Sequence, residues 1–160
     1  MPAKGTESNG PGTTTIGWKE RMPIGEPFLF LDHAELTETG ARGRYRITGN
    51  EPALRGHFKN SPVMPASLML EALGQLGVFF LLHHAQARAA AGGEVRPETI
   101  FLSSCDGVRC SRFCRPGDEL ELEVTARRVR APLAGFSGAV FAGARERAVR
   151  AEEIVLGFGA

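Results

Sequence analysis

Residues 66–87 decide the fold, and they read ASLMLEALGQLGVFFLLHHAQA. Apolar side chains would point in almost every direction around a helix from Ala66 to about Ala87, so no face of it would prefer water. Such a helix must be covered on all sides by other elements. Glu71 and Gln75 interrupt the apolar run. We therefore expect no membrane span, which needs about 20 nearly uninterrupted apolar residues.

Strands that could cover this helix are indicated by side chains that alternate between polar and apolar. The alternation is clear in residues 42–47 and 119–126. Two further strands are expected at 136–143 and 148–158, and one weaker strand is expected over 100–105 and 108–113. Because successive strand residues point to opposite sheet faces, the alternation gives one charged and one apolar face. The apolar run at 27–33 fits either a buried strand or a helical turn.

The order of these elements indicates an α+β architecture. One long buried helix precedes several antiparallel strands, short turns between them favour a meander, and the helix needs a sheet to wrap it. Prolines and glycines in residues 50–65 predict a shaped loop before the helix. Gly92 and Gly93 are expected to end the helical segment and begin a connection.

Composition and charge limit the class of protein. The chain has 160 residues, 42% hydrophobic and 23% charged, which suits one cored domain. Residues 1–17 are rich in Gly, Thr, Pro and Ser and lack the apolar run of a secretory signal, so we expect a disordered tail there and a single domain over 18–160. A net charge of +1 gives no overall attraction for nucleic acid, and three cysteines favour a reducing, cytoplasmic location.

Candidate chemistry gathers where the loop meets the helix. Glu71 in so apolar a helix should lose solvation, which favours its protonated form, so it could donate a proton. His57 lies on the preceding loop, and histidine titrates near neutral pH, so it could act as a base. Gln75 lies one turn after Glu71 on the same helix face and could orient its carboxyl group. The plain alternative is that Glu71 neutralises a local charge and His57 is an exposed loop residue.

The start of the helix offers a site for developing negative charge. Pro65 can open the helix, which leaves the N–H groups of Ala66 and Ser67 without intrahelical partners at the positive end of the dipole. A carbonyl oxygen that gains charge would be stabilised there.

The segment 56–75 resembles the β-hydroxyacyl-acyl carrier protein dehydratases of fatty-acid synthesis. Their pattern is Gly-His-Phe, two prolines with a small residue after the second, and an acid fourteen residues after the His. In this chain those places are filled by Gly56, His57, Phe58, Pro62, Pro65, Ala66 and Glu71. The resemblance extends over about residues 22–158, through the run at 27–32 and the stretch from Arg109 to Asp118 that ends in Pro-Gly-Asp.

This resemblance implies a hot-dog fold and a cofactor-free dehydration. The substrate would be a β-hydroxyacyl thioester on acyl carrier protein, and the product the trans-2-enoyl thioester, in fatty-acid or related lipid or polyketide synthesis. His57 would take the α-proton and Glu71 would protonate the departing hydroxyl. Substrate would be bound by Phe58, Pro65, Ala66, Ser67 and Gln75. The family's site is shared across a dimer interface, so we expect a homodimer or higher homo-oligomer.

Two positions depart from the family's pattern. Ala66 stands where the family has Gly; it keeps the N–H but adds a methyl group. Glu71 is typical of the general dehydratases, whereas the run from Pro62 to Pro65 resembles the subgroup that also isomerises. A hot-dog thioesterase and a non-catalytic acyl-thioester-binding subunit are the alternatives. The acidic carrier would dock on Arg109, Arg112 and Arg115, although these could equally belong to a solvated sheet face.

Other motifs are weaker. Residues 135–139 read GFSGA, which nearly spells a nucleophile elbow but suits a packed strand kink better. Cys105, Cys110 and Cys114 lack the paired spacing of a zinc site, so we expect buried thiols and no metal. His83 and His84 are expected to cap carbonyls or face solvent.

Overall fold

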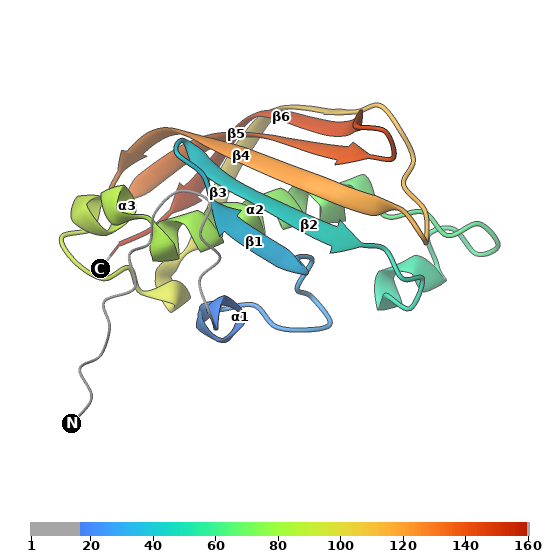
Figure 1. Ribbon diagram of the computed structural model, residues 1–160, viewed down its shortest axis with the longest axis horizontal. Helices are drawn as coiled ribbons and strands as arrows, with labels where there is room; N and C mark the ends of the chain where they lie inside the picture. The colour runs from blue at the N-terminus through green and yellow to red at the C-terminus, as the bar shows by residue number, and fades with distance from the viewer. Residues whose placement is uncertain (1–16, 160) are drawn as a thin grey trace.

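A computed structural model describes residues 17–159 of the chain, and its six strands form one antiparallel sheet around one long helix (Figure 1). The strand order is β1-β2-β4-β5-β6-β3. The strands are β1 (His33–Leu36), β2 (Gly40–Arg46), β3 (Phe101–Cys110), β4 (Glu119–Arg130), β5 (Leu133–Ala142) and β6 (Glu146–Gly157). The helices are α1 (Trp18–Arg21), α2 (Ala66–His83) and α3 (Ala85–Ala90), with 3-10 turns η1 (Pro52–Arg55) and η2 (Pro97–Thr99). The predicted α+β hot-dog architecture is confirmed.

Helix α2 is the predicted buried helix, but it ends earlier than expected. His84 leaves the helical conformation, and its Nδ1 accepts a hydrogen bond of 3.1 Å from the backbone N–H of Gln86. This side chain therefore caps a second short helix, α3, which the continuous apolar pattern could not reveal. Gly92 and Gly93 follow with positive φ angles of 76° and 153° and end the helical segment as predicted.

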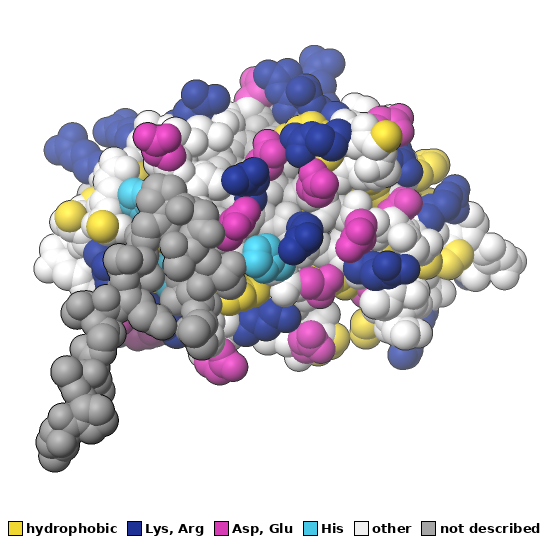
Figure 2. All heavy atoms as spheres, viewed as in Figure 1, with side chains coloured by type: hydrophobic (Ala, Val, Ile, Leu, Met, Phe, Trp, Pro, Cys, Tyr) yellow, Lys and Arg dark blue, Asp and Glu magenta, His cyan; other side chains and the backbone are white. Residues whose placement is uncertain are grey.

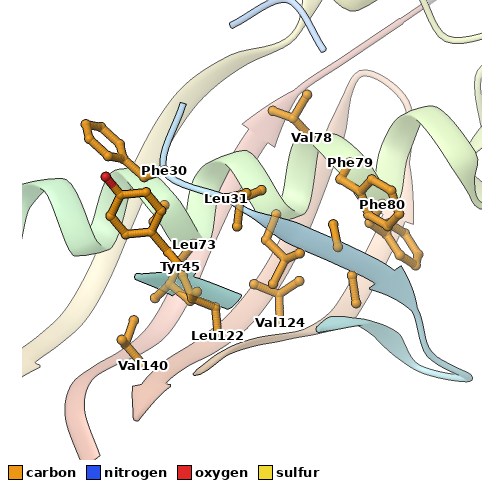
Figure 3. Close-up of a cluster of buried hydrophobic side chains, with 14 of the residues drawn as sticks. Phe30, Leu31, Tyr45, Leu73, Val78, Phe79, Phe80, Leu122, Val124 and Val140 are labelled. Atoms are coloured by element: carbon orange, nitrogen blue, oxygen red, sulfur yellow. The ribbon is translucent and has the colours of Figure 1, made fainter. Parts of the chain in front are cut away.

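The core lies between α2 and the sheet face that wraps it. Phe79, Phe80 and Leu73 of α2 are fully buried among the strand residues Leu122 and Val124 (Figure 3). Alternation in β4 is confirmed, because its apolar residues face the helix and its glutamates face outward. Helix α2 is long and apolar enough to cross a membrane, yet 67% of it is buried within the protein. It is therefore used as a core helix.

Three strand predictions need correction. In the run at 27–33 only His33 belongs to a strand, β1; residues 27–32 are a turn and irregular chain that lead into it, with Phe30 and Leu31 buried. The weaker strand expected over 100–105 and 108–113 is confirmed as one strand, β3, but it runs without a break from Phe101 to Cys110 and pairs with β6. The meander therefore holds only for β4, β5 and β6. The expected tail over 1–17 lies outside the described residues apart from Gly17, so it stays a prediction.

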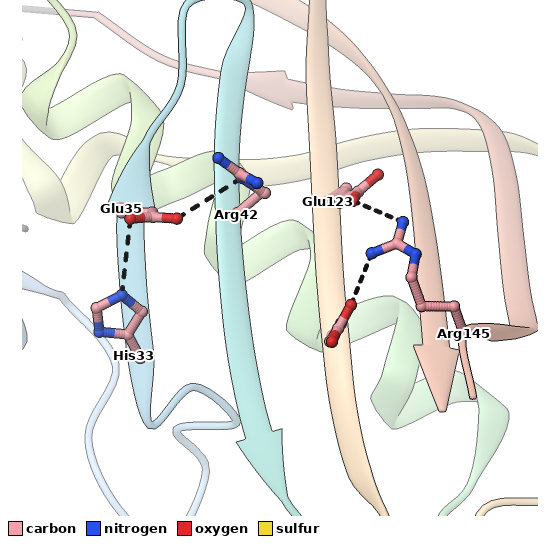
Figure 4. A network of polar contacts seen from close by, with 6 residues as sticks. His33, Glu35, Arg42, Glu123 and Arg145 are labelled. Atoms are coloured by element: carbon pink, nitrogen blue, oxygen red, sulfur yellow. Dashed lines mark hydrogen bonds and ion pairs between the residues drawn. The ribbon is translucent and has the colours of Figure 1, made fainter. Parts of the chain in front are cut away.

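The outer face of the sheet is charged, and the exposed β3 edge carries three large apolar side chains among polar ones. Figure 2 shows basic and acidic side chains mixed over the outer face. In Figure 4, Arg145 bonds Glu121 at 2.7 Å and Glu123 at 3.1 Å, and the Arg42–Glu35 pair lies nearby at 3.6 Å. On β3 nearly every residue is exposed, including Phe101, Leu102 and Val108.

Candidate active site

The loop before α2 is anchored by a buried carboxylate. Glu51 accepts hydrogen bonds from the Tyr45 hydroxyl at 2.9 Å, the Thr48 N–H at 2.7 Å and the Gly49 N–H at 2.8 Å. Burial acts to raise the pKa of Glu51, but the bonds to its carboxylate outweigh burial and hold that pKa below its ordinary value. Burial and the neighbouring Glu51 raise the pKa of Tyr45. The sequence analysis missed this anchor, which fixes the start of η1 and so the approach to His57.

His57 is held in one orientation by the loop. Its Nδ1 lies 2.9 Å from the carbonyl oxygen of Val63, and its ring stacks on that of Phe58 with centroids 4.2 Å apart. A carbonyl can only accept a hydrogen bond, so Nδ1 must carry the proton. The neutral ring then keeps its lone pair on Nε2, which bonds no other described residue. The predicted base therefore has its basic nitrogen available.

A second contact ties this loop to the turn before β4. Arg115 Nη1 donates to Ser61 Oγ at 2.8 Å, and the backbone N–H of Arg115 donates to Asp118 at 2.9 Å. Arg112 lies 3.6 Å from both Asp118 and Glu146. Two of the three arginines predicted to contact the carrier thus have partners within the chain. Arg109 is exposed on β3 and forms no ion pair within residues 17–159.

The start of α2 has the predicted geometry. Pro65 precedes the first helical residue, and its carbonyl accepts hydrogen bonds from Leu68 at 3.0 Å and Met69 at 3.1 Å. The N–H groups of Ala66 and Ser67 find no acceptor in the part of the chain that the structure describes. Two donors are therefore free at the positive end of an 18-residue helix.

Glu71 is half-buried and is bonded by Gln75. The Gln75 Nε2 donates to Glu71 Oε1 at 3.1 Å and to the carbonyl of Phe28 at 2.7 Å, while Gln75 Oε1 accepts from the Phe30 N–H at 2.8 Å. The prediction that Gln75 orients the carboxyl group is supported by this contact. The two bonds to residues 28–30 were not predicted, because nothing in the local pattern places that segment beside α2.

An apolar cavity of about 170 Å³ opens beside Glu71. It is lined by Ile24, Leu70, Glu71, Gly74, Gln75, Val78, Ile100, Phe101, Leu102 and Leu156. Hollows of about 220, 380, 380 and 430 Å³ elsewhere on the described residues each have three or more charged side chains in their lining, whereas Glu71 is the one charged side chain in this lining. The hollow beside Glu71 is therefore the one whose chemistry suits a hydrocarbon chain. The sequence patterns did not identify Ile24 and Gly74 as cavity-lining residues. For Gly74 a signal was present, because a glycine inside a helix often has a packing or functional reason.

The structure does not bring every predicted site residue together within one chain. His57 and Glu71 form neither a hydrogen bond nor an ion pair with each other, and His57 does not line the cavity beside Glu71. Glu71 with Gln75, and His57 with Phe58, form two separate groups.

The weaker motifs have structural explanations. The run at 135–139 lies inside β5, where the pairing with β6 shifts register between Phe136 and Gly138. Cys114 is buried, and burial raises the pKa of its thiol; Cys105 is half-buried, and Cys110 is exposed, contrary to the expected burial. Within residues 17–159 no three His, Cys, Asp or Glu side chains are grouped to hold a metal ion.

The antiparallel sheet that wraps α2 defines a hot-dog protein, and a carboxyl group and an imidazole lie near the start of that helix. A FabA-like domain model matches residues 22–151, and the chain belongs to this family. It is 43% identical over 114 residues to the 3-hydroxyacyl-[acyl-carrier-protein] dehydratase FabZ of Thermomicrobium roseum, which covers 70% of this chain and 71% of that protein. The FabZ of Clostridium perfringens is 38% identical over 122 residues, or 76% of this chain and 81% of the relative.

Solved structures agree on the fold. The dehydratase heterocomplex ApeI:P of Xenorhabdus doucetiae matches with a TM-score of 0.68 at 12% identity, over 88% of this chain and 90% of that one. The PaaI protein of E. coli matches with a TM-score of 0.55 at 12% identity, over 77% of this chain and 75% of that one.

Proposed function

We propose that this chain dehydrates a 3-hydroxyacyl thioester carried on acyl carrier protein to the trans-2-enoyl thioester and water, in fatty-acid synthesis. The observation that carries the proposal is the His57 ring, whose Nδ1 faces the Val63 carbonyl and whose Nε2 is left as a base. The named activity of the FabZ relatives supports the same chemistry. We further propose a cytoplasmic location and no cofactor.

The reaction follows from three groups. His57 Nε2 takes the α-proton, and the electrons of that C–H bond form the new carbon–carbon double bond through an enolate. The thioester oxygen gains charge and is held by the N–H groups of Ala66 and Ser67. Glu71 gives its proton to the β-hydroxyl, which leaves as water, and proton transfer from His57 to Glu71 restores the site. Each acid–base step contributes about 10²–10⁴-fold.

The remaining site residues bind and orient. Gln75 holds the Glu71 carboxyl group, and Pro65 fixes where the helix begins. Phe58 stacks on the His57 ring and is 52% exposed, so its face is free to border the thioester. Ala66 supplies the N–H that Gly supplies in the family.

We also propose that the active site is completed by a second copy of the chain. On β3, Leu102 pairs with Leu156 and Val108 pairs with Ala151, so these exposed residues lie on the helix side of the sheet. A long exposed apolar edge strand is normally covered by pairing. Pairing of β3 with a second β3 would cover it, and Glu71 of one chain would then meet His57 of the other.

The activity is tested with the purified chain and a 3-hydroxyacyl thioester on carrier protein. We expect the enoyl thioester to accumulate without release of free thiol. Release of thiol without enoyl product would instead identify a thioesterase, and the absence of both reactions would identify a non-catalytic binding subunit.

The shared site is tested by mixing inactive His57→Ala and Glu71→Ala proteins under conditions in which subunit exchange is verified by tagged co-purification. Half of the dimers are then mixed and each has one intact pair, so about a quarter of wild-type activity should return. Verified mixed dimers without recovered activity would rule out the shared site.

A further inference from the structure

Helix α2 contains two glycines, and only one has a packing reason. A glycine inside a helix costs roughly 0.5–1 kcal/mol relative to alanine. At Gly77 a Cβ would lie 3.0 Å from Leu156 Cδ1 and 3.5 Å from the Phe136 ring, so close packing excludes a side chain. At Gly74 a Cβ would meet nothing within 4 Å. The fold itself therefore does not require glycine at position 74.

Gly74 faces the cavity beside the candidate acid. It lies three residues after Glu71, nearly one helical turn, and both line the same hollow of about 170 Å³. The aliphatic walls come from separate parts of the chain: Ile24 from the segment after α1, Val78 from α2, and Leu102 from β3. A side chain at position 74 would project into this hollow and reduce its volume.

The size and lining of the cavity indicate what it holds. An apolar protein cavity of about 150 Å³ is large enough for benzene, which has six carbons. A hollow of about 170 Å³ therefore suits a hydrocarbon group of roughly six carbons.

We propose that Gly74 determines the acyl-chain specificity of this protein, because it leaves room beside Glu71 for a hydrocarbon group of about six carbons on the β-carbon of the substrate. This inference rests on the proposed dehydration and names its substrate class. The group is a linear alkyl chain or an aryl ring, since both fit an apolar hollow. Ile24, from the segment after α1, lines the same hollow and limits its volume from outside the helix.

The test compares kcat/KM for carrier-bound 3-hydroxyacyl thioesters from butanoyl to hexadecanoyl, with a 3-hydroxy-3-phenylpropanoyl thioester as the aryl arm. In Gly74→Leu we expect kcat/KM for octanoyl and longer substrates to fall more than about ten-fold, while that for butanoyl changes less than about two-fold, since each displaced CH₂ is worth about four-fold. Gly74→Ala should show a smaller change in the same direction. Ile24→Ala should shift the preference toward longer chains.

Controls separate this inference from the proposed function. Gly25→Ala adds the same methyl group in open space outside the cavity and should leave the chain-length profile unchanged. Gly74→Ala favours the helix, so it should raise the melting temperature. This variant therefore still measures the change in chain-length preference if Gly74→Leu fails to fold. An equal loss for all chain lengths, or an unchanged profile, would overturn the inference. If the wild type dehydrates nothing, the proposed function fails, and binding of non-hydrolysable acyl-pantetheine amides of the same lengths to wild type and Gly74→Leu still decides the role of Gly74.

Discussion

The two ends of α2 differ in how deeply the sheet buries them and in which hydrogen bonds their polar groups form. In the first turns Glu71 is half-buried, borders a cavity and is bonded by one amide, while two backbone N–H groups find no acceptor among residues 17–159. In the last turns every residue from Leu76 to His83 is buried, and the Nε2 of His83 has no hydrogen-bond partner among the described residues. The proposed chemistry therefore lies at the end of α2 that the sheet leaves open, and the other end belongs to the core.

The largest expected effect on activity comes from substituting the polar side chains at the open end of α2. Glu71→Gln and His57→Ala should each lower kcat/KM for dehydration by about 10²–10⁴-fold, because each removes one proton transfer. Circular dichroism and melting temperature should stay close to wild type. His33→Ala, a half-buried histidine on β1, is the matched control and should keep its activity. Near-normal turnover by His57→Ala would disprove the assignment of the base.

Core truncation at the covered end should act on stability instead. Phe80 is fully buried and packs edge-on against Phe136 with centroids 5.5 Å apart, so Phe80→Ala should lower the free energy of unfolding by about 3–5 kcal/mol. Leu68→Ala, at a half-buried position in the first turn, should cost clearly less. Denaturant titration measures both. Equal losses would show that the two ends are packed alike.

The buried His83 predicts a dependence of stability on pH. Burial lowers the pKa of His83, and the neighbouring charges of Arg21 and Arg88 lower it further, although the bond to the Phe79 carbonyl acts in the opposite direction. The folded-state pKa of His83 thus lies below the unfolded value of about 6.5. The contribution of neutral His83 to the free energy of unfolding is therefore complete above pH 6.5 and is lost as pH falls through the folded-state pKa.

The measurement is the free energy of unfolding between pH 7 and pH 5. His83→Phe keeps a ring against Phe79 but cannot be protonated, so its stability should fall less steeply with acid than that of the wild type. The slope for one proton is at most about 1.4 kcal/mol per pH unit. Identical slopes in the two proteins would show that His83 does not titrate on unfolding.

The smallest expected effect concerns the carrier protein. Arg109 is exposed and has no ion pair within residues 17–159, so Arg109→Ser tests docking without removing an ion pair inside the chain, and sedimentation of the variant checks that its oligomeric state is unchanged. We expect KM for carrier-bound substrate to rise a few-fold at low salt, and the difference to shrink as salt screens the charge. KM for a short pantetheine thioester should not change. A salt-independent KM in the wild type would count against an electrostatic dock.

Sequence periodicity was sufficient for the parts of the fold that depend on local pattern. The helix start at Ala66, the β2 strand and the alternation of β4 follow from which residues prefer to be buried. The place of β3 beside β6 could not be predicted, because it depends on a crossover past the helix and β3 itself is exposed on both faces. The break at His84 was also hidden, since a histidine cap looks like any polar residue at a helix end.

The candidate site was predictable where its residues follow a motif and not where they meet across the chain. His57, Glu71 and Gln75 are close in sequence: their types and spacing made them candidates, and the resemblance of segment 56–75 to the dehydratases singled out His57 and Glu71. The Ser61–Arg115 bond and the contacts of Gln75 with residues 28–30 join segments far apart in sequence, so only the folded chain reveals them.

The hydrogen bonds of Gln75 also make the two carboxyl oxygens of Glu71 different from each other. The Phe30 N–H can only donate and the Phe28 carbonyl can only accept, so the Gln75 amide cannot flip: its oxygen faces Phe30 and its nitrogen faces Phe28 and Glu71. An N–H aimed at Oε1 requires that oxygen to present a lone pair. The contact therefore makes the two chemically equivalent oxygens of Glu71 different: Oε1 is engaged by the amide, and in the proposed reaction Oε2 is the oxygen left to face the β-hydroxyl.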